Sequence, residues 1–204
     1  MTFAPIEPLP TLLLVPGSMR RESFNARLLQ DLAWRLQGRC RVDFLAPEQV
    51  ELPLFDQDLE ADPQMILRLA GLHRRFSACH GMIVASPEYN GQLPPYLKNL
   101  IDWTSRLAHI DPRFDNPFLD RPVLLCSATT GSSGGAVAMA SARALFAYIG
   151  CLVIGDRLCL PYAAESWTDV GYLFEPFFDE RIDSALGRVL RLAGNFAQSA
   201  ARQS

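Results

Sequence analysis

Short apolar runs alternate along this chain with longer segments in which apolar residues recur at helical spacing. Each run extends over four or five residues and carries few polar side chains, which is typical of buried parallel strands. The first run, Leu12 to Val15, is closed by Pro16 and Gly17. We expect strands at 12–15, 41–45, 81–85, 123–127 and 151–154.

The segments between the runs predict amphipathic helices. Leu28, Leu29, Leu32 and Leu36 follow the helical period, so one face of that segment is apolar. Asp62 followed by Pro63 is typical of a helix start, because Asp caps the first turn and Pro fits the first helical position. We expect helices at 26–36, 63–76, 94–107, 136–149 and 178–197.

Strands that alternate with helices indicate right-handed crossovers and a parallel sheet. The length of 204 residues favours a single domain over residues 1–204. Five strands with a polar loop after the first suit a flavodoxin-like three-layer sandwich, with strand order 2-1-3-4-5 and helices on both faces.

Composition narrows the function classes. The net charge of −3 and the absence of a long basic run argue against nucleic-acid binding. No apolar run reaches membrane-spanning length, and the first ten residues lack a signal-peptide pattern, so we expect a cytoplasmic protein with no membrane association. The five cysteines lack CxxC spacing and the three histidines are scattered, so we expect reduced, structural cysteines and no metal site.

The loop after the first run has the chemistry of an anion site. Ser18, Arg20, Ser23 and Asn25 stand just before the first helix, whose unpaired N–H groups and partial positive charge favour a phosphate. The same residues also suit a helix cap in a solvated turn. The loop is neither a Walker A motif nor a dinucleotide GxGxxG, because Gly17 is its only glycine.

Two further loops of unusual composition follow the third and fourth runs, at 86–91 and 128–135. In the expected strand order all three loops open on the carboxyl edge of the sheet, where ligands bind in such folds. A phosphate on the first loop and a flat polar ring between the other two would describe FMN. Backbone N–H groups around Tyr89, Asn90 and Gly91 could reach the ring, and Gly131, Gly134 and Gly135 permit close approach of the third loop.

The chain resembles the NAD(P)H-dependent FMN reductase family in two motifs. Residues 17–25 read GSMRRESFN, similar to the GSxRxxSxN phosphate loop, and residues 87–103 resemble the family segment PEYNGxxPxxLKNxxDW. The resemblance extends from about Leu12 to Val153, and more loosely through 169–171. It implies non-covalent FMN, NADPH or NADH as electron donor, a small-molecule acceptor, and a homodimer or homotetramer. The third loop departs from the family pattern at Ser127 to Gly131, while Gly134 and Gly135 match.

By this resemblance the first loop holds the phosphate and the other two hold the isoalloxazine. We expect no catalytic side chain, because the flavin carries the chemistry, and we interpret Glu88 and Tyr89 as ring-packing or subunit-contact residues. Aromatic and apolar residues near Trp103, Phe114 and Phe118 favour an oligomer. The expected cofactor contacts are Ser18, Arg20, Ser23, Phe24, Asn25, Pro87, Glu88, Tyr89, Asn90, Gly91, Ser127, Thr130, Gly131 and Gly134.

Three functions compete at this point. The first is an FMN-dependent oxidoreductase that passes hydride from NAD(P)H to a quinone, azo dye, metal oxyanion or free flavin. The second is an electron carrier or flavin-binding partner protein without NAD(P)H activity, against which the weak net charge argues. The third is a scaffold that has lost flavin, against which the intact first loop argues. Segments 109–121 and 160–170, which we expect to shape the substrate entrance, match no pattern, so the sequence does not identify the electron acceptor.

Overall fold

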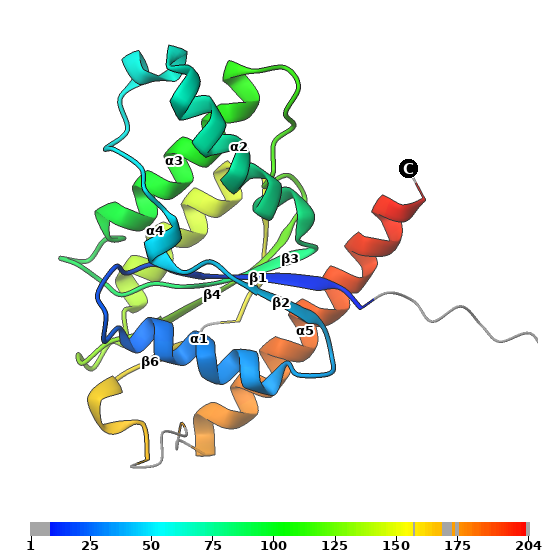
Figure 1. Ribbon diagram of the computed structural model, residues 1–204. Coiled ribbons are helices and arrows are strands. Elements are labelled where there is room, and N and C mark those ends of the chain that lie inside the picture. Colours follow the sequence, from blue (N-terminus) through cyan, green and yellow to red (C-terminus); the bar gives the residue numbers. More distant parts are fainter. Residues whose placement is uncertain (1–8, 157, 169–172, 174–175, 203–204) are drawn as a thin grey trace, which may run out of the picture.

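A computed structural model describes residues 9–156, 158–168, 173 and 176–202 of the chain (Figure 1). The expected lead-in before residue 9 and the loose family resemblance at 169–171 lie outside the described residues. A parallel sheet crosses the middle of the molecule, with helices above and below it (Figure 1).

The central strands match the apolar runs of the sequence. They are β1 (Thr11–Pro16), β2 (Arg41–Phe44), β3 (Gly81–Ala85) and β4 (Pro122–Ala128), and each pairs in parallel with its neighbour. The order β2-β1-β3-β4-β5 confirms the predicted flavodoxin-like arrangement. In register, Leu14 lies opposite Ile83, and Ile83 lies opposite Leu124.

The fifth position of the sheet is divided between two short strands, where the sequence predicted one. β5 (Leu152–Val153) pairs with the start of β4, and β6 (Leu158–Leu160) pairs with its end. Gly155 and Asp156 interrupt the apolar run between them. β6 therefore ends at Leu160, the first residue of the segment 160–170 that matches no pattern.

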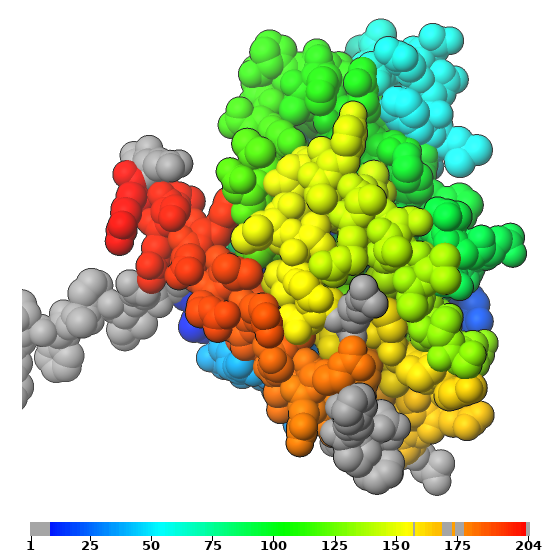
Figure 2. Space-filling model, turned by 180° about the vertical axis from the view of Figure 1, so that it is seen from behind, coloured from blue at the N-terminus to red at the C-terminus, as the bar shows by residue number. Residues whose placement is uncertain are grey.

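Helices cover both faces of the sheet. α1 (Phe24–Arg35) and α5 (Pro176–Ala201) lie on one face, and α2 (Pro63–Ala78), α3 (Pro95–Ile110) and α4 (Ala136–Tyr148) on the other (Figure 1). Seen from behind, the surface runs from α3 in green through α4 in yellow-green to α5 in orange and red (Figure 2). All the predicted helices are present. Short 3-10 helices at Pro47–Gln49, Gln57–Ala61 and Ala163–Glu165 punctuate the connections.

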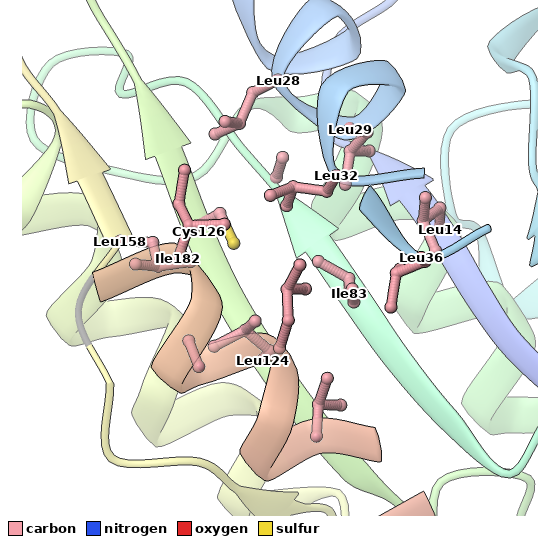
Figure 3. Close-up of a cluster of buried hydrophobic side chains, with 14 of the residues drawn as sticks. Leu14, Leu28, Leu29, Leu32, Leu36, Ile83, Leu124, Cys126, Leu158 and Ile182 are labelled. Carbon is pink, nitrogen blue, oxygen red and sulfur yellow. The ribbon is translucent and has the colours of Figure 1, made fainter. Parts of the chain in front are cut away.

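Each face of the sheet has its own apolar core, because alternate residues of a strand point to opposite faces. Leu12 and Leu14 join the core with α1 and α5, and Leu13 and Val15 join the core with α2, α3 and α4. The leucines of α1 point onto the strands, where they meet Ile83, Cys126 and, from α5, Ile182 (Figure 3). Within the described residues, every helix is too short or too polar to cross a bilayer.

The cysteines belong to this packing. All five are free thiols; Cys40, Cys79, Cys126 and Cys151 are buried and Cys159 is partly buried. Burial raises the pKa of the Cys151 thiol to about 12, and it raises the pKa of the Cys126 thiol further. A thiol with so high a pKa stays protonated near neutral pH and is a poor nucleophile.

A pair of leucine substitutions tests the importance of the sheet core. Leu14 is fully buried and Leu54 is 77% exposed. Leu14→Ala should lower the free energy of unfolding by about 2–5 kcal/mol, through lost burial and a residual cavity. Leu54→Ala should change it by less than about 0.5 kcal/mol. Urea titrations of both variants and the wild type measure the difference, and equal effects would contradict this account of the core.

Candidate functional site

Three loops meet at the carboxyl edge of the sheet, on the left in Figure 1. They follow β1, β3 and β4, and backbone hydrogen bonds continue between them past the strands. The N–H of Gly17 donates to Ala85 at 2.7 Å, and that of Ser86 donates to Cys126 at 2.9 Å. A hollow of about 160 Å³ lies among the loops, lined by Ser18, Arg20, Ser23, Phe24, Asn25, Pro87, Glu88, Tyr89, Ala128, Thr129 and Thr130.

The first loop places two serine hydroxyls at the start of α1. Ser23 caps the helix, with its Oγ accepting from the N–H of Ala26 at 3.3 Å. Ser18 Oγ accepts from the N–H of Arg20 at 3.2 Å. Each hydroxyl keeps its own proton for donation into the hollow. The cap interpretation of this loop is therefore correct for Ser23, and it is compatible with an anion site at the same place.

Arg20 lies over the loop at the rim of the hollow. Its Nη2 donates to the carbonyl of Glu22 at 2.7 Å, and its guanidinium carbon lies 5.6 Å from the centre of the Phe24 ring. A guanidinium carries five N–H donors, so most of them remain available to an anion. Both contacts hold the charge next to the start of α1.

Asn25 has a different structural role from the one the sequence suggested. Its Nδ2 donates to the carbonyl of Ala128 at 2.8 Å, and its Oδ1 accepts from the N–H of the same residue at 2.9 Å. The side chain is buried. The amide therefore joins the start of α1 to the end of β4, and it shapes the hollow instead of presenting a free side chain to an anion.

The second loop forms a tight hairpin at its tip. Tyr89 and Gln92 exchange two backbone hydrogen bonds of 3.0 Å. Asn90 and Gly91 both have positive φ, 53° and 73°, as a two-residue turn of this kind requires. The backbone N–H of Tyr89, expected to face a ring, is thus paired within the hairpin. The Tyr89 ring is 47% exposed at the edge of the hollow.

Glu88 fastens the second loop to the third. The N-cap of α4, Gly135, has no side chain, and Glu88 Oε2 instead accepts from the N–H of Ala138 at 2.9 Å. A carboxylate at a helix N-terminus is favourable, because the unpaired N–H groups carry partial positive charge. This placement gives Glu88 a helix-capping role that the sequence interpretation, which proposed ring packing or a subunit contact, did not include.

The glycines of the third loop allow close packing. A Cβ on Gly134 would come within 2.8 Å of the Cys159 backbone, and one on Gly135 within 2.1 Å of Ser127 Oγ. Ser127 is fully buried beneath Gly135. Thr130 lines the hollow together with its neighbour Thr129. The predicted contacts absent from its lining are Asn90, Gly91, Ser127, Gly131 and Gly134.

The segment after β6 packs against the first and third loops, which the sequence did not indicate. The N–H of Thr129 donates to Leu160 at 3.1 Å, and the N–H of Ala163 donates to Thr129 at 2.9 Å. Trp167 stacks on Phe24, with ring centres 5.9 Å apart and planes 12° apart. The segment thereby connects the third loop to the first. A tryptophan in an irregular stretch was the only sequence signal for it.

The donor set of the hollow fits FMN. Hydroxyls, a guanidinium and the first N–H groups of α1 gather at one end, which suits a phosphate. Among the described residues that line the hollow, Glu88 is the only carboxylate, and it accepts a hydrogen bond from the first turn of α4. Among the residues that the structure describes, no group of three His, Cys, Asp or Glu side chains is placed to hold a metal ion.

Comparison with known proteins points to an FMN-dependent family of oxidoreductases. The model of the NADPH-dependent FMN reductase family matches residues 10–165. A quinone reductase of Escherichia coli (strain K12) is 30% identical over 138 residues, which cover 68% of this chain and 70% of the relative. A 2-hydroxy-1,4-benzoquinone reductase of a Burkholderia species is 29% identical, covering 70% of this chain and 73% of the relative.

A solved structure confirms the fold. FerB, a flavoenzyme NAD(P)H:(acceptor) oxidoreductase from Paracoccus denitrificans, superposes with a TM-score of 0.78 at 22% identity. The match covers 92% of this chain and 99% of that one.

The bridge made by Asn25 predicts an unusual dependence on pH for one substitution. In Asn25→Asp at neutral pH, a buried carboxylate would face the Ala128 carbonyl without a proton to donate, which should cost about 1–3 kcal/mol of unfolding free energy or more. Burial raises the pKa of such a carboxyl. The native state then binds a proton more readily than the unfolded state, so the penalty is full above the folded-state pKa and shrinks as pH falls.

Urea unfolding of the wild type and Asn25→Asp at pH 7 and pH 4.5 measures this difference. A protonated Asp can donate to the carbonyl and accept from the N–H, as Asn does, so the gap between the two proteins should narrow at pH 4.5. A gap that stays constant or widens would contradict the proposed protonation of the buried Asp side chain at this bridge.

Proposed function

This chain belongs to the NADPH-dependent FMN reductase family, and from that premise we propose that it reduces quinones with the flavin held among the three loops. It is an oxidoreductase that uses FMN and takes electrons from NAD(P)H for a small-molecule acceptor. Membership of this family supports the enzyme over the electron-carrier alternative. The quinone is our inference from two relatives named for quinone reduction.

The phosphate of the flavin is assigned to the first loop. Ser18 and Ser23 each donate a hydrogen bond from the hydroxyl group, and the first turn of α1 donates hydrogen bonds from its backbone N–H groups. Arg20 adds a charge-assisted hydrogen bond. Asn25 supports this end indirectly, since its bridge to Ala128 fixes the helix start against β4. The single observation that carries the proposal is that side chains of all three loops line one hollow.

The isoalloxazine is assigned to the space between the second and third loops. Pro87 and Tyr89 contribute apolar surface on one side, and Thr129 and Thr130 contribute hydroxyls on the other. Glu88 keeps the two loops at a fixed separation through its hydrogen bond to Ala138. In this proposal Asn90, Gly91, Gly131 and Gly134 shape the loops, and Ser127 supports the third loop from below.

Bound FMN supplies the redox chemistry, in which hydride from NAD(P)H is taken up and two electrons pass to the acceptor. The chain supplies binding and orientation. Reduction of a quinone to a hydroquinone consumes one hydride and one proton. Solvent at the open hollow can provide the proton. No side-chain acid or base is therefore required, which agrees with the hydrogen bond that already occupies the Glu88 carboxylate.

We further propose a homodimer or homotetramer built from one domain over residues 1–204. Trp103 and Phe118, which the sequence suggested as contributors to a subunit contact, are fully buried inside the subunit and cannot serve. That part of the prediction was wrong, because the spacing of aromatic residues does not distinguish a core from an interface. Leu67, an exposed apolar side chain of α2, is a better candidate.

The assignment of the phosphate predicts unequal effects of two neighbouring arginines. Arg20→Ala should weaken FMN binding by about tenfold or more, because it removes a charge-assisted hydrogen bond. Arg21→Ala should weaken it less, since Arg20 lines the hollow and Arg21 does not. Quenching of FMN fluorescence on titration with apoprotein gives both dissociation constants. Equal losses would remove Arg20 from the phosphate site.

The reaction itself is tested by absorbance under anaerobic conditions. Protein loaded with FMN should lose its flavin absorbance on addition of NADPH or NADH, and a stoichiometric amount of a benzoquinone should restore it. Bleaching without recovery would reject the quinone as acceptor. Binding of FMN without bleaching by either nucleotide would favour the carrier alternative.

A further inference from the structure

Trp167 lies beyond the part of the chain that the family model matches, and its ring contacts a residue of the flavin site. The match of the family model ends at residue 165. The Trp167 ring lies almost parallel to the Phe24 ring, with centres 5.9 Å apart and planes 12° apart. Phe24 lines the hollow among the three loops, and Trp167 does not. The tryptophan therefore supports a lining residue without lining the hollow itself.

The Phe24 ring is in turn a support for Arg20. The guanidinium carbon of Arg20 lies 5.6 Å from the centre of that ring, a distance typical of a cation–π contact. A second contact is the hydrogen bond of 2.7 Å from Arg20 Nη2 to the Glu22 carbonyl, in an exposed setting. Because water competes with an exposed hydrogen bond, the ring contact helps to keep the guanidinium in one direction.

Hydrogen bonds hold the segment before Trp167 against the third loop. The N–H of Ala163 donates to the Thr129 carbonyl at 2.9 Å. The hydroxyl of Ser166 donates to the Tyr162 carbonyl at 3.2 Å, which closes the turn directly before the tryptophan. Trp167 is thus joined to the third loop through the backbone and to the start of α1 through its ring.

Packing also restrains the indole. Phe24 and Trp167 both pack against the apolar core that α1 and α5 share with the sheet. The guanidinium carbon of Arg27 lies 4.8 Å from the centre of the indole ring. Among the residues that the structure describes, the indole N–H has no hydrogen-bond partner. The contacts of this side chain are therefore made by the face of its ring, which a phenyl ring can replace.

We propose that Trp167 is a positioning residue for the phosphate of FMN. Its stack with Phe24 keeps that ring beside Arg20, and so keeps the guanidinium directed at the phosphate end of the hollow. A donor that is already in place binds more tightly, because less side-chain freedom is lost when the ligand arrives. Since Arg20 is assigned to the phosphate by the proposed function, this role for Trp167 rests on that proposal.

The test compares two flavins that differ only in the phosphate. Riboflavin lacks the phosphate of FMN, so the ratio of the two dissociation constants reports on the phosphate site alone. The wild type should bind FMN about a hundredfold more tightly than riboflavin, because the charge-assisted hydrogen bonds are made only to FMN. Trp167→Leu should lower this preference by about fivefold or more and leave the riboflavin affinity unchanged. Quenching of flavin fluorescence on titration with apoprotein measures all four constants.

Further variants make the readout specific. Trp167→Phe should keep the wild-type preference within about twofold, because a phenyl ring can still stack on Phe24. Trp167→Met keeps apolar volume but no flat ring, and it replaces Trp167→Leu if that variant does not fold. Trp34→Leu is the matched control, since Trp34 is 58% exposed on the same helix as Phe24, and it should leave both flavin affinities unchanged.

A double substitution tests whether Trp167 acts through Arg20. Once Arg20→Ala has removed the guanidinium, adding Trp167→Leu should change the preference for FMN by less than about twofold, because both substitutions remove the same contribution. Two losses that multiply would show that the tryptophan does not act through this arginine, and they would overturn the proposed role.

The other failures can be told apart. Equal losses of FMN and riboflavin affinity in Trp167→Leu would mean that the tryptophan shapes the whole site, and they would overturn its role at the phosphate. A preference that is unchanged in Trp167→Leu but falls in Arg20→Ala would overturn that role and leave the phosphate assignment in place. A wild type that binds both flavins equally would overturn the phosphate assignment, and the role of Trp167 with it.

Discussion

The two hydrogen bonds between the Asn25 amide and the Ala128 peptide hold the site in its shape. They join residues 103 positions apart, at the start of α1 and the end of β4. β1 and β4 are not neighbours, because β3 lies between them. The amide therefore reaches across the end of a strand, and it does so in a buried, low-dielectric setting where an unmatched polar group is costly. The first and third loops owe their relative position to it.

The sheet and its strand order could be predicted because buried parallel strands have short apolar sequences, and amphipathic helices separate them. Leu12 to Val15 and Gly81 to Ala85 are clear examples, buried on both faces. β6 was not predicted, because a strand of three residues with mixed burial is too short to show a periodic pattern of apolar residues. The strand is defined instead by its pairing with the end of β4.

The candidate site was predictable in place but less so in the role of each residue. Three polar loops after parallel strands indicate a candidate ligand site by topology alone. Asn25 shows the limit of the approach, because an amide suits both a phosphate and a peptide group, and only the distance to Ala128 distinguishes them. Trp167 shows another limit, since its stacking on Phe24 joins segments that no local pattern relates.

The segment after β6 has a mechanical consequence for the third loop. Thr129 is bonded to Leu160 on one side and to Ala163 on the other, so this loop continues the hydrogen-bonded pairing of β4 with β6. Any displacement of the Thr129 backbone therefore has to break backbone hydrogen bonds, which the rotation of side chains alone does not require.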